Sequence, residues 1–285
     1  MIIDFADLAG ESHRDEPWLS GHGARVTLRL EDLLFTVEEG RRIRIVAPPE
    51  TGENKIRLWL LGTVMATLLH QRGYFPLHAN SVVLGNGAVA AFSGPSGAGK
   101  STMAALLDRE GFRVLGDDLC AIKVDAGQRP RVFGGIPRLK LWHETLELFG
   151  QGADGLEPVG GGLDKFHVPL DGVQEVGSLE CRPLERLYLL ALREREDEPL
   201  IQPIGGMLAA GSVLDNAFRW SIGQSVAGEN SRAQFDQALA IARTIAVFRI
   251  ARRWGRDHLF EEGAAIAAHL AAPLTNSDAD GGAAS

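Results

Sequence analysis

Residues 94–101 read Gly94-Pro95-Ser96-Gly97-Ala98-Gly99-Lys100-Ser101 and fill the pattern G-x-x-x-x-G-K-[ST] of a phosphate-binding loop. The run at 87–92 predicts a strand before the loop, and residues 100–110 predict a helix after it that stops at Gly111. In this strand–loop–helix context the glycines let backbone N–H groups turn toward phosphate oxygens at the positive end of the helix. The sequence therefore predicts that the chain binds a nucleotide.

Two side chains at the end of the loop have specific tasks in this motif. Lys100 is expected to reach the β- and γ-phosphates, and the Ser101 hydroxyl is expected to ligate Mg²⁺. ATP and Mg²⁺ are therefore the expected cofactors. The predicted nucleotide-binding residues are Gly94, Pro95, Ser96, Gly97, Ala98, Gly99, Lys100, Ser101 and Thr102.

The acid pair Asp117-Asp118 follows the next predicted strand, at 112–115, and Asp117 lies seventeen residues after Lys100. We expect this strand to run beside the strand of the loop, so that its end lies near the γ-phosphate. Neighbouring side chains on extended backbone point opposite ways, so one carboxylate can face the Mg²⁺–phosphate site. A carboxylate there can take the proton of an acceptor hydroxyl during phosphoryl transfer. The alternative interpretation is a solvated Gly-Asp-Asp turn.

Four further side chains are candidates, each with a plainer interpretation beside the functional one. His78 starts the strand before the loop strand, although a lone histidine is more often structural. Arg138 and Lys140 could neutralise charge on a transferring phosphoryl group, or form the solvated face of a strand. Lys165 follows the glycine-rich segment 150–162, which we expect to be a mobile functional loop without regular structure. Lys165 could reach the site when this loop closes, or remain a solvated loop lysine.

In their order and spacing, Leu77-His78-Ala79, the loop at 94–101 and Asp117-Asp118 resemble the catalytic domain of HPr kinase/phosphorylase. The resemblance is closer to the HPr-kinase-like proteins encoded with lasso-peptide and other modified-peptide gene clusters. Phosphoenolpyruvate carboxykinase shares the related core. The matching motifs span about residues 75–142.

This resemblance implies both a fold and a set of roles. The implied fold is α/β, with a P-loop kinase core, a mixed sheet with flanking helices and a small N-terminal β-rich region. Asp117 is implied to be the base toward an acceptor serine, with His78 paired to Asp117. Asp118 is implied to lie near the metal, together with Ser101. A homo-oligomer is also implied.

The chain departs from the bifunctional family members in several places. Thr102 follows Ser101 where those enzymes have glutamate, and no E-[IV]-R-G segment follows the acid pair. Their later loop of lysine and arginine, which is linked with phosphorolysis, has no recognisable counterpart. These departures argue against reverse phosphorolysis and leave the kinase interpretation in place.

Composition limits the possible classes of protein. The chain has 285 residues, a net charge of −8 and two cysteines without a CxxC motif. This length suits one large α/β domain with a small appendage, and the acidic balance argues against nucleic-acid binding. The cysteines favour a reducing compartment and no zinc site. The most apolar stretch, 58–69, is too short to span a bilayer. We therefore expect a cytoplasmic protein that binds no membrane.

Apolar periodicity divides the chain into three parts. Residues 1–74 form the predicted β-rich region, with 1–22 loosely ordered and a helix at 53–73. Residues 75–272 form the predicted kinase domain, and 273–285 a disordered tail. Further strands are predicted at 25–30, 34–37, 42–46, 81–84, 119–124, 131–133, 185–193 and 247–251, and further helices at 204–214, 230–245 and 257–270.

Together, these features predict a Mg²⁺/ATP-dependent kinase that phosphorylates a serine hydroxyl on a peptide or small protein. The resemblance favours a lasso or other modified-peptide precursor as acceptor, with HPr second. Two alternatives stay open: a nucleotide-gated binding protein without phosphoryl transfer, and a small-molecule kinase.

Overall fold

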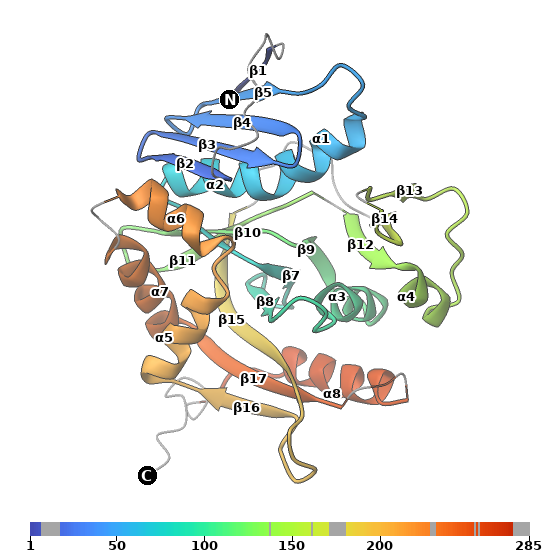
Figure 1. Ribbon diagram of the computed structural model, residues 1–285. Helices are drawn as coiled ribbons and strands as arrows, with labels where there is room; N and C mark the ends of the chain where they lie inside the picture. Colours follow the sequence, from blue (N-terminus) through green and yellow to red (C-terminus); the bar gives the residue numbers. More distant parts are fainter. Residues whose placement is uncertain are drawn as a thin grey trace.

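A computed structural model of the chain describes residues 1–6, 18–136, 138–160, 162–170, 181–228, 232–253, 255 and 257–275. These residues form a mixed α/β structure with three sheets and helices packed between and around them (Figure 1). The tail predicted to be disordered lies outside the described residues from 276 onward. No helix in the described part of the chain has the length and apolar character needed to cross a membrane.

The N-terminal sheet has the strand order β1-β5-β4-β3-β2. Alternating side chains such as Val26 and Leu28 of β3 are buried on its inner face, as the sequence pattern predicts. Its strands are β1 (Ile2–Ala6), β2 (Leu19–His22), β3 (Arg25–Leu30), β4 (Leu33–Glu38) and β5 (Arg42–Val46).

The expectation that residues 1–22 are loosely ordered is wrong for the two ends of that segment. Strand β1 pairs with β5 in parallel, and β2 pairs with β3. Backbone hydrogen bonds hold these edge strands, while Ile2 and Phe5 remain exposed. An edge strand without a buried face gives no apolar alternation, so the sequence pattern could not reveal it. Residues 7–17 lie outside the described part of the chain.

A helical rod covers the inner face of this sheet (Figure 1). It consists of α1 (Glu53–Trp59), η1 (Leu60–Val64) and α2 (Met65–Gln71), where η1 is a turn of π-helix. The helix predicted at 53–73 is confirmed, apart from the π-helical turn. Val64 and Leu68 of the rod share an apolar core with the sheet and with Ile222 of α6 (Trp220–Ala227).

The main sheet has the order β6-β10-β11-β15-β8-β7-β9, with β17 added beside β15 and β16 beside β17. Strands β8, β15 and β17 are parallel, so their carboxyl ends meet at one edge of the sheet. The strands are β6 (Phe75–Leu77), β7 (Ala79–Val83), β8 (Val89–Ser93), β9 (Arg113–Gly116), β10 (Cys120–Val124), β11 (Pro130–Phe133), β15 (Cys181–Leu192), β16 (Ile201–Ile204) and β17 (Ala246–Arg252).

Strand β9 does not lie beside the loop strand β8, contrary to our expectation. Its neighbour is β7, which forms an antiparallel hairpin with β8 and takes up that side of it. Strand β15 occupies the other side of β8. The end of β9 is therefore one strand further from the loop than predicted.

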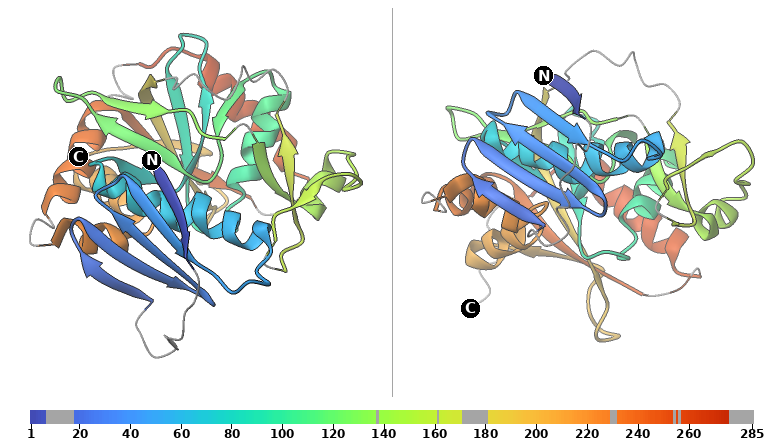
Figure 2. Two further views of the ribbon diagram at one scale, coloured as in Figure 1. Left: turned by 90° about the horizontal axis from the view of Figure 1, so that it is seen from above. Right: turned by 45° about the horizontal axis from the view of Figure 1, so that its top comes forward.

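Helices cover both faces of the main sheet (Figure 2). On one face lie α3 (Lys100–Arg109) and α8 (Leu259–Ala271), packed against side chains such as Phe92. On the other face lie α5 (Gly206–Asp215) and α7 (Arg232–Thr244), packed against side chains such as Ala91. The helices predicted at 100–110, 204–214, 230–245 and 257–270 are confirmed, whereas α6 was not predicted.

The third sheet is small and has the order β12-β14-β13. Its strands are β12 (Arg138–Trp142), β13 (Glu157–Pro158) and β14 (Lys165–Pro169), and α4 (His143–Leu148) follows β12. The glycine-rich segment 150–162 was expected to lack regular structure, yet it contains β13. This strand is short, and both of its residues are exposed. Its backbone pairs with β14, which no apolar pattern could reveal.

Candidate functional site

The predicted phosphate-binding loop joins β8 to α3 at the edge where β15 and β17 also end. Gly94 has φ 149°, and a Cβ atom there would lie 2.7 Å from the Leu190 carbonyl oxygen. Gly99 has φ 84° and forms the N-cap of α3. Glycine is therefore required at both positions. The loop tip, Pro95 to Gly97, is exposed, so the cradle opens to solvent at a helix N-terminus and suits phosphate.

Lys100 lies inside this loop. Its Nζ donates hydrogen bonds to the carbonyl oxygens of Gly94 at 2.9 Å and Pro95 at 3.2 Å. Burial lowers the pKa of Lys100, an effect that the charge of Asp118 opposes. The loop itself thus holds the ammonium group of Lys100, inside the cradle in which the motif predicts that phosphates bind.

Asp117 lies between α3 and β12. Its Oδ1 accepts a hydrogen bond from the Ser101 hydroxyl at 3.2 Å, and its Oδ2 accepts one from the Lys140 backbone N–H at 2.6 Å. Although part of this residue reaches solvent, protein atoms around the carboxylate raise its pKa to about 6 through burial. The Lys140 N–H opposes this rise by stabilising the charged form.

Asp118 leaves the extended conformation that we expected for the acid pair. Its φ is 73°, and the Leu119 N–H donates to the Asp117 carbonyl oxygen at 2.9 Å, which closes a tight γ-turn centred on Asp118. A non-glycine residue in this conformation is strained, at a cost of about 1–3 kcal/mol. The turn redirects the Asp118 side chain away from that of Asp117, and such strain gathers at functional sites.

The Asp118 carboxylate is held from two sides. His78 Nε2 lies 3.1 Å from its Oδ1, and Lys140 Nζ lies 3.0 Å from its Oδ2. Burial alone would raise the pKa of Asp118, but the hydrogen bond from His78 and the charge of Lys140 together hold it below its usual range. This carboxylate is therefore ionised at neutral pH.

The expected pairing of His78 with Asp117 is wrong. His78 pairs with Asp118, and it is Asp117 that lies beside Ser101, where the resemblance implied Asp118. The two side chains do diverge, as predicted, but the γ-turn and the two bonds from Lys140 reverse which one faces the loop.

Residues far away in the sequence hold His78 in place. Its backbone N–H donates to the Asn216 carbonyl oxygen at 2.9 Å, and its ring lies edge-on to Phe218 with 5.3 Å between ring centres. The Ser93 hydroxyl lies 2.6 Å from the His78 carbonyl oxygen and 2.9 Å from Asn216 Oδ1. No motif marks Asn216 or Phe218, because fold topology alone brings this segment to β6 and β7.

The other predicted cations lie on the third sheet. Arg138 and Lys140 occupy one face of β12, so the predicted strand is present, but both side chains are largely covered and the solvated face expected of that interpretation is wrong. Lys165 belongs to β14, and its Nζ lies 4.5 Å from the centre of the Trp142 ring. Burial is the main cause that lowers the pKa of Lys100, and the positive charge of Lys165 lowers it further. Thr102 faces α4, with its hydroxyl 3.3 Å from that of Thr145.

Arg252 is a residue at this edge that the sequence analysis missed. It ends β17, and its Nη1 lies 2.9 Å from the point that a Cβ of Gly99 would occupy. Burial lowers the pKa of Arg252, opposed by Glu262, whose Oε2 is 3.9 Å from its Nε. Among the described residues, neither of these two buried atoms has a hydrogen-bond partner. The basic run at 252–256 was the available sequence signal.

The residues at this edge fit a nucleotide with Mg²⁺. The described part of the chain holds no cluster of three or more His, Cys, Asp or Glu side chains that could bind a metal alone. Magnesium usually takes one or two protein ligands and completes its shell with phosphate and water. The adjacent oxygens of Ser101 and Asp117 provide that kind of partial site.

No protein-family model matches the chain, and no curated protein matches it. Among solved structures, the chain is similar to the HPr(Ser) kinase/phosphatase from Coxiella burnetii, with 14% sequence identity and a TM-score of 0.35. That match covers 68% of this chain and 96% of the other. Because the identity and the TM-score are both low, the assignment of the candidate site depends on the residues of this chain alone.

Proposed function

We propose that this chain is a Mg²⁺/ATP-dependent kinase of the HPr-kinase type that phosphorylates a serine hydroxyl on a peptide or small protein. The observation that carries the proposal is the grouping of a phosphate-binding loop with two carboxylates in different surroundings. Asp117 bonds to Ser101 of the loop, and Asp118 bonds to His78 and Lys140. The Asp117 carboxylate is thus available to Mg²⁺, and the Asp118 carboxylate is available to the acceptor hydroxyl.

The loop and its neighbours would hold the nucleotide. Backbone N–H groups of the loop and Lys100 bind the phosphates, and Ser101 with Asp117 ligates Mg²⁺. Arg252 adds a positive charge beside Gly99, where its Nη1 lies, and a guanidinium group suits a phosphate oxygen. When bound, ATP would supply the phosphoryl group and Mg²⁺ would neutralise charge on its oxygens.

Asp118 would accept the proton of the acceptor hydroxyl while His78 and Lys140 fix its orientation. A carboxylate whose pKa lies below its usual range is a weak base. Phosphoryl transfer tolerates this, because positioning and electrostatics dominate its catalysis. The acceptor oxygen would form its bond to the γ-phosphorus, the bond from that phosphorus to the bridging oxygen of the leaving ADP would break, and the hydroxyl proton would pass to Asp118. Asp118 therefore takes the role that the resemblance implied for Asp117.

Transfer from labelled ATP tests the proposal. The wild-type chain is incubated with Mg²⁺, γ-labelled ATP and a panel of serine-containing acceptors that includes modified-peptide precursors and HPr, and ATP binding is measured separately. We expect label on an acceptor serine, and we expect Lys100→Met to abolish it. ATP binding without any labelled acceptor would favour the nucleotide-gated binding protein, and label on small hydroxyl compounds alone would favour a small-molecule kinase.

A further inference from the structure

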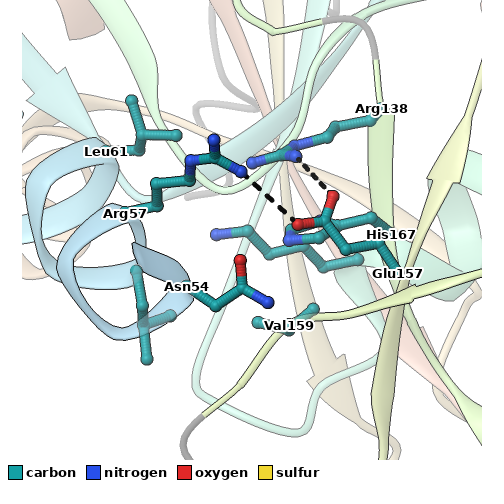
Figure 3. A pocket seen from close by; sticks show the side chains of 9 residues that line it. Asn54, Arg57, Leu61, Arg138, Glu157, Val159 and His167 are labelled. Atoms are coloured by element: carbon teal, nitrogen blue, oxygen red, sulfur yellow. Dashed lines mark ion pairs between the residues drawn. The ribbon is translucent and has the colours of Figure 1, made fainter. Parts of the chain in front are cut away.

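A small pocket lies between α1 and the third sheet (Figure 3). Its polar lining includes three cationic side chains, Arg57, Arg138 and Lys140, and comes from two parts of the chain. Arg57 and Asn54 extend from α1, and Arg138 and His167 extend from the sheet. The lining residues are Asn54, Arg57, Leu58, Leu61, Arg138, Lys140, Glu157, Val159 and His167.

Strand register explains why these side chains share one face. Lys140 pairs with His167, and His167 pairs with Glu157, so the three form a row across the sheet. Arg138 lies two residues before Lys140 and therefore points to the same side. The intervening Leu139 is buried in the core against α3, on the opposite face of β12.

The charges of the pocket converge on one carboxylate of the chain itself. Arg57 Nη1 lies 3.7 Å from Glu157 Oε1, and Arg138 Nη1 lies 3.9 Å from Glu157 Oε2 (Figure 3). Both distances exceed those of a direct hydrogen bond, so neither guanidinium is tightly held there. Burial, followed by the charges of Arg138 and Lys140, lowers the pKa of His167 and keeps its ring neutral.

Lys140 connects this pocket to the proposed reaction centre. Its Nζ lies 3.0 Å from Asp118 Oδ2, and its side chain also lines the pocket. Only the Lys140 side chain would therefore separate a group bound between Arg57 and Arg138 from the carboxylate of Asp118, which takes the proton of the acceptor hydroxyl in the proposed reaction.

We propose that this pocket binds a carboxylate of the phosphoacceptor, in place of Glu157, and thereby positions the acceptor serine at Asp118. The inference rests on the proposed kinase function and adds a substrate class to it: serine peptides that carry a nearby carboxylate, from an acidic side chain or from the chain terminus. Two guanidinium groups that already face a loosely held internal carboxylate suit such an exchange, because the guanidinium fork matches the geometry of a carboxylate.

The pocket also assigns a task to the N-terminal region. Arg57 is 53% exposed and lies on the part of α1 that faces the third sheet rather than the N-terminal sheet. Its other partner, Glu53, is 83% exposed at 3.0 Å and forms a solvated pair of little energetic weight. Acceptor recognition would thus require residues from both the N-terminal region and the kinase core.

Binding of labelled peptides tests this proposal independently of phosphoryl transfer. The probes are short fluorescein-labelled serine peptides that carry either glutamate or glutamine near the serine, each with a free or an amidated C-terminus. Fluorescence anisotropy gives their affinities for the full chain and for Arg57→Gln, Arg138→Gln and Glu157→Gln. Arg44→Gln, an exposed arginine of β5 away from the pocket, is the matched control.

We expect the wild-type chain and Arg44→Gln to bind at least one carboxylate-bearing peptide about tenfold more tightly than its neutral counterpart. Arg57→Gln and Arg138→Gln should remove most of that preference, and Glu157→Gln should increase it by removing the internal competitor. The four peptide forms show whether the carboxylate comes from a side chain or from the terminus.

Several outcomes would overturn the pocket proposal. These are equal binding of all four peptides, no measurable binding of the carboxylate-bearing ones, or variants that lower only the thermal stability while the preference persists. The last result would make Glu157 a structural link between α1 and β13. A carboxylate preference without any phosphoryl transfer would count against the kinase function and leave the pocket proposal standing.

Discussion

At the scale of single residues, the site depends on the γ-turn at Asp118. It gives two adjacent carboxylates different environments: Asp117 between Ser101 and the Lys140 backbone, and Asp118 between His78 and the Lys140 ammonium group. Burial raises the pKa of Asp117 to about 6, whereas the partners of Asp118 hold its pKa below the usual range. Such a separation is the means by which enzymes give two carboxylates separate roles.

Substitution of each aspartate by asparagine separates these roles. Asparagine tolerates a positive φ, so Asp118→Asn should retain the γ-turn and the fold. We expect Asp118→Asn to lower kcat for acceptor phosphorylation by about 10²–10⁴-fold with ATP affinity almost unchanged, since a proton acceptor is lost. Asp117→Asn should instead raise the Mg²⁺ concentration that nucleotide binding requires. Steady-state kinetics and Mg²⁺ titrations measure both effects.

Asp236→Asn, on an exposed part of α7, serves as the control and should change neither quantity. If Asp118→Asn alters the Mg²⁺ requirement while Asp117→Asn abolishes transfer, the roles are those that the family resemblance implied. The exchange of roles proposed for the pair is then incorrect.

At the scale of elements, the parallel strands β8, β15 and β17 determine which residues meet at the proposed nucleotide site. Each strand ends at the same edge, so Arg252 at the end of β17 reaches Gly99 although β15 lies between β17 and β8. Such convergence at the carboxyl ends of parallel strands is the general reason why ligands bind there in open α/β sheets. Arg252 is the largest addition that the structure makes to the predicted nucleotide site.

Arg252→Met tests this addition, because methionine keeps much of the apolar volume and removes the charge. Glu262 retains its partner Arg253, whose Nε lies 3.0 Å from Glu262 Oε1, so no carboxylate is left without a counter-charge. We expect ATP affinity to fall about tenfold or more, from the loss of a charge-assisted hydrogen bond. Isothermal calorimetry measures it, with the exposed Arg243→Met as control. An unchanged affinity would remove Arg252 from the site.

At the scale of the whole molecule, the N-terminal region and the main sheet with its helices are joined through α2, α6 and α7. His70 of α2 is buried at this junction, with Nε2 3.3 Å from the Phe218 carbonyl oxygen and Nδ1 3.2 Å from Gln234 Nε2. Ile222 of α6 lies in the same apolar core as the N-terminal sheet. The junction is therefore part of the folded core and contains a titratable group.

This junction predicts a loss of stability in mild acid. Burial lowers the pKa of His70 to about 4, below the ordinary value of 6.5, so the unfolded chain binds the proton more readily between these values. The contribution of neutral His70 to the free energy of unfolding should therefore be fully present above about pH 6.5. The free energy of unfolding should fall by about 3 kcal/mol as the pH drops toward 4. Denaturant titrations across this range, with wild type and His70→Gln, measure the effect.

His70→Gln should be less stable at pH 7 and should lose less stability on acidification. His22→Gln, at an exposed position of β2, controls for removal of a histidine. If the wild type and His70→Gln lose the same free energy between pH 7 and pH 4.5, His70 does not cause the acid sensitivity.

The local elements were predictable where one chain segment carried its own signal. The loop at 94–101, the helix at 100–110 and the alternating strands of the N-terminal sheet follow from glycine spacing and apolar period. The acid pair was also expected near the loop, and Asp117 does bond to Ser101, although the strand adjacency on which that expectation rested was wrong.

What was missed depends on backbone conformation and on distant contacts. The positive φ at Asp118 exchanged the expected partners of the two aspartates, and the β7–β8 hairpin separated β9 from β8. The spacing of apolar residues carries no information about either feature. Arg57 and Arg252 reach the site from segments that lie far from the loop in sequence. Such contacts are properties of the fold rather than of any local motif.

The π-helical turn η1 has a consequence for how one rod can serve two surfaces. An α-helix turns by about 100° per residue, and a π-helical turn accommodates one surplus residue, so α1 is rotated by about that angle relative to an unbroken continuation of α2. Leu68 of α2 can therefore face the N-terminal sheet while Arg57 of α1 faces the pocket. Without the π-helical turn, Arg57 and Leu68 would lie on nearly the same face of one helix, and Arg57 would face the N-terminal sheet instead of the pocket.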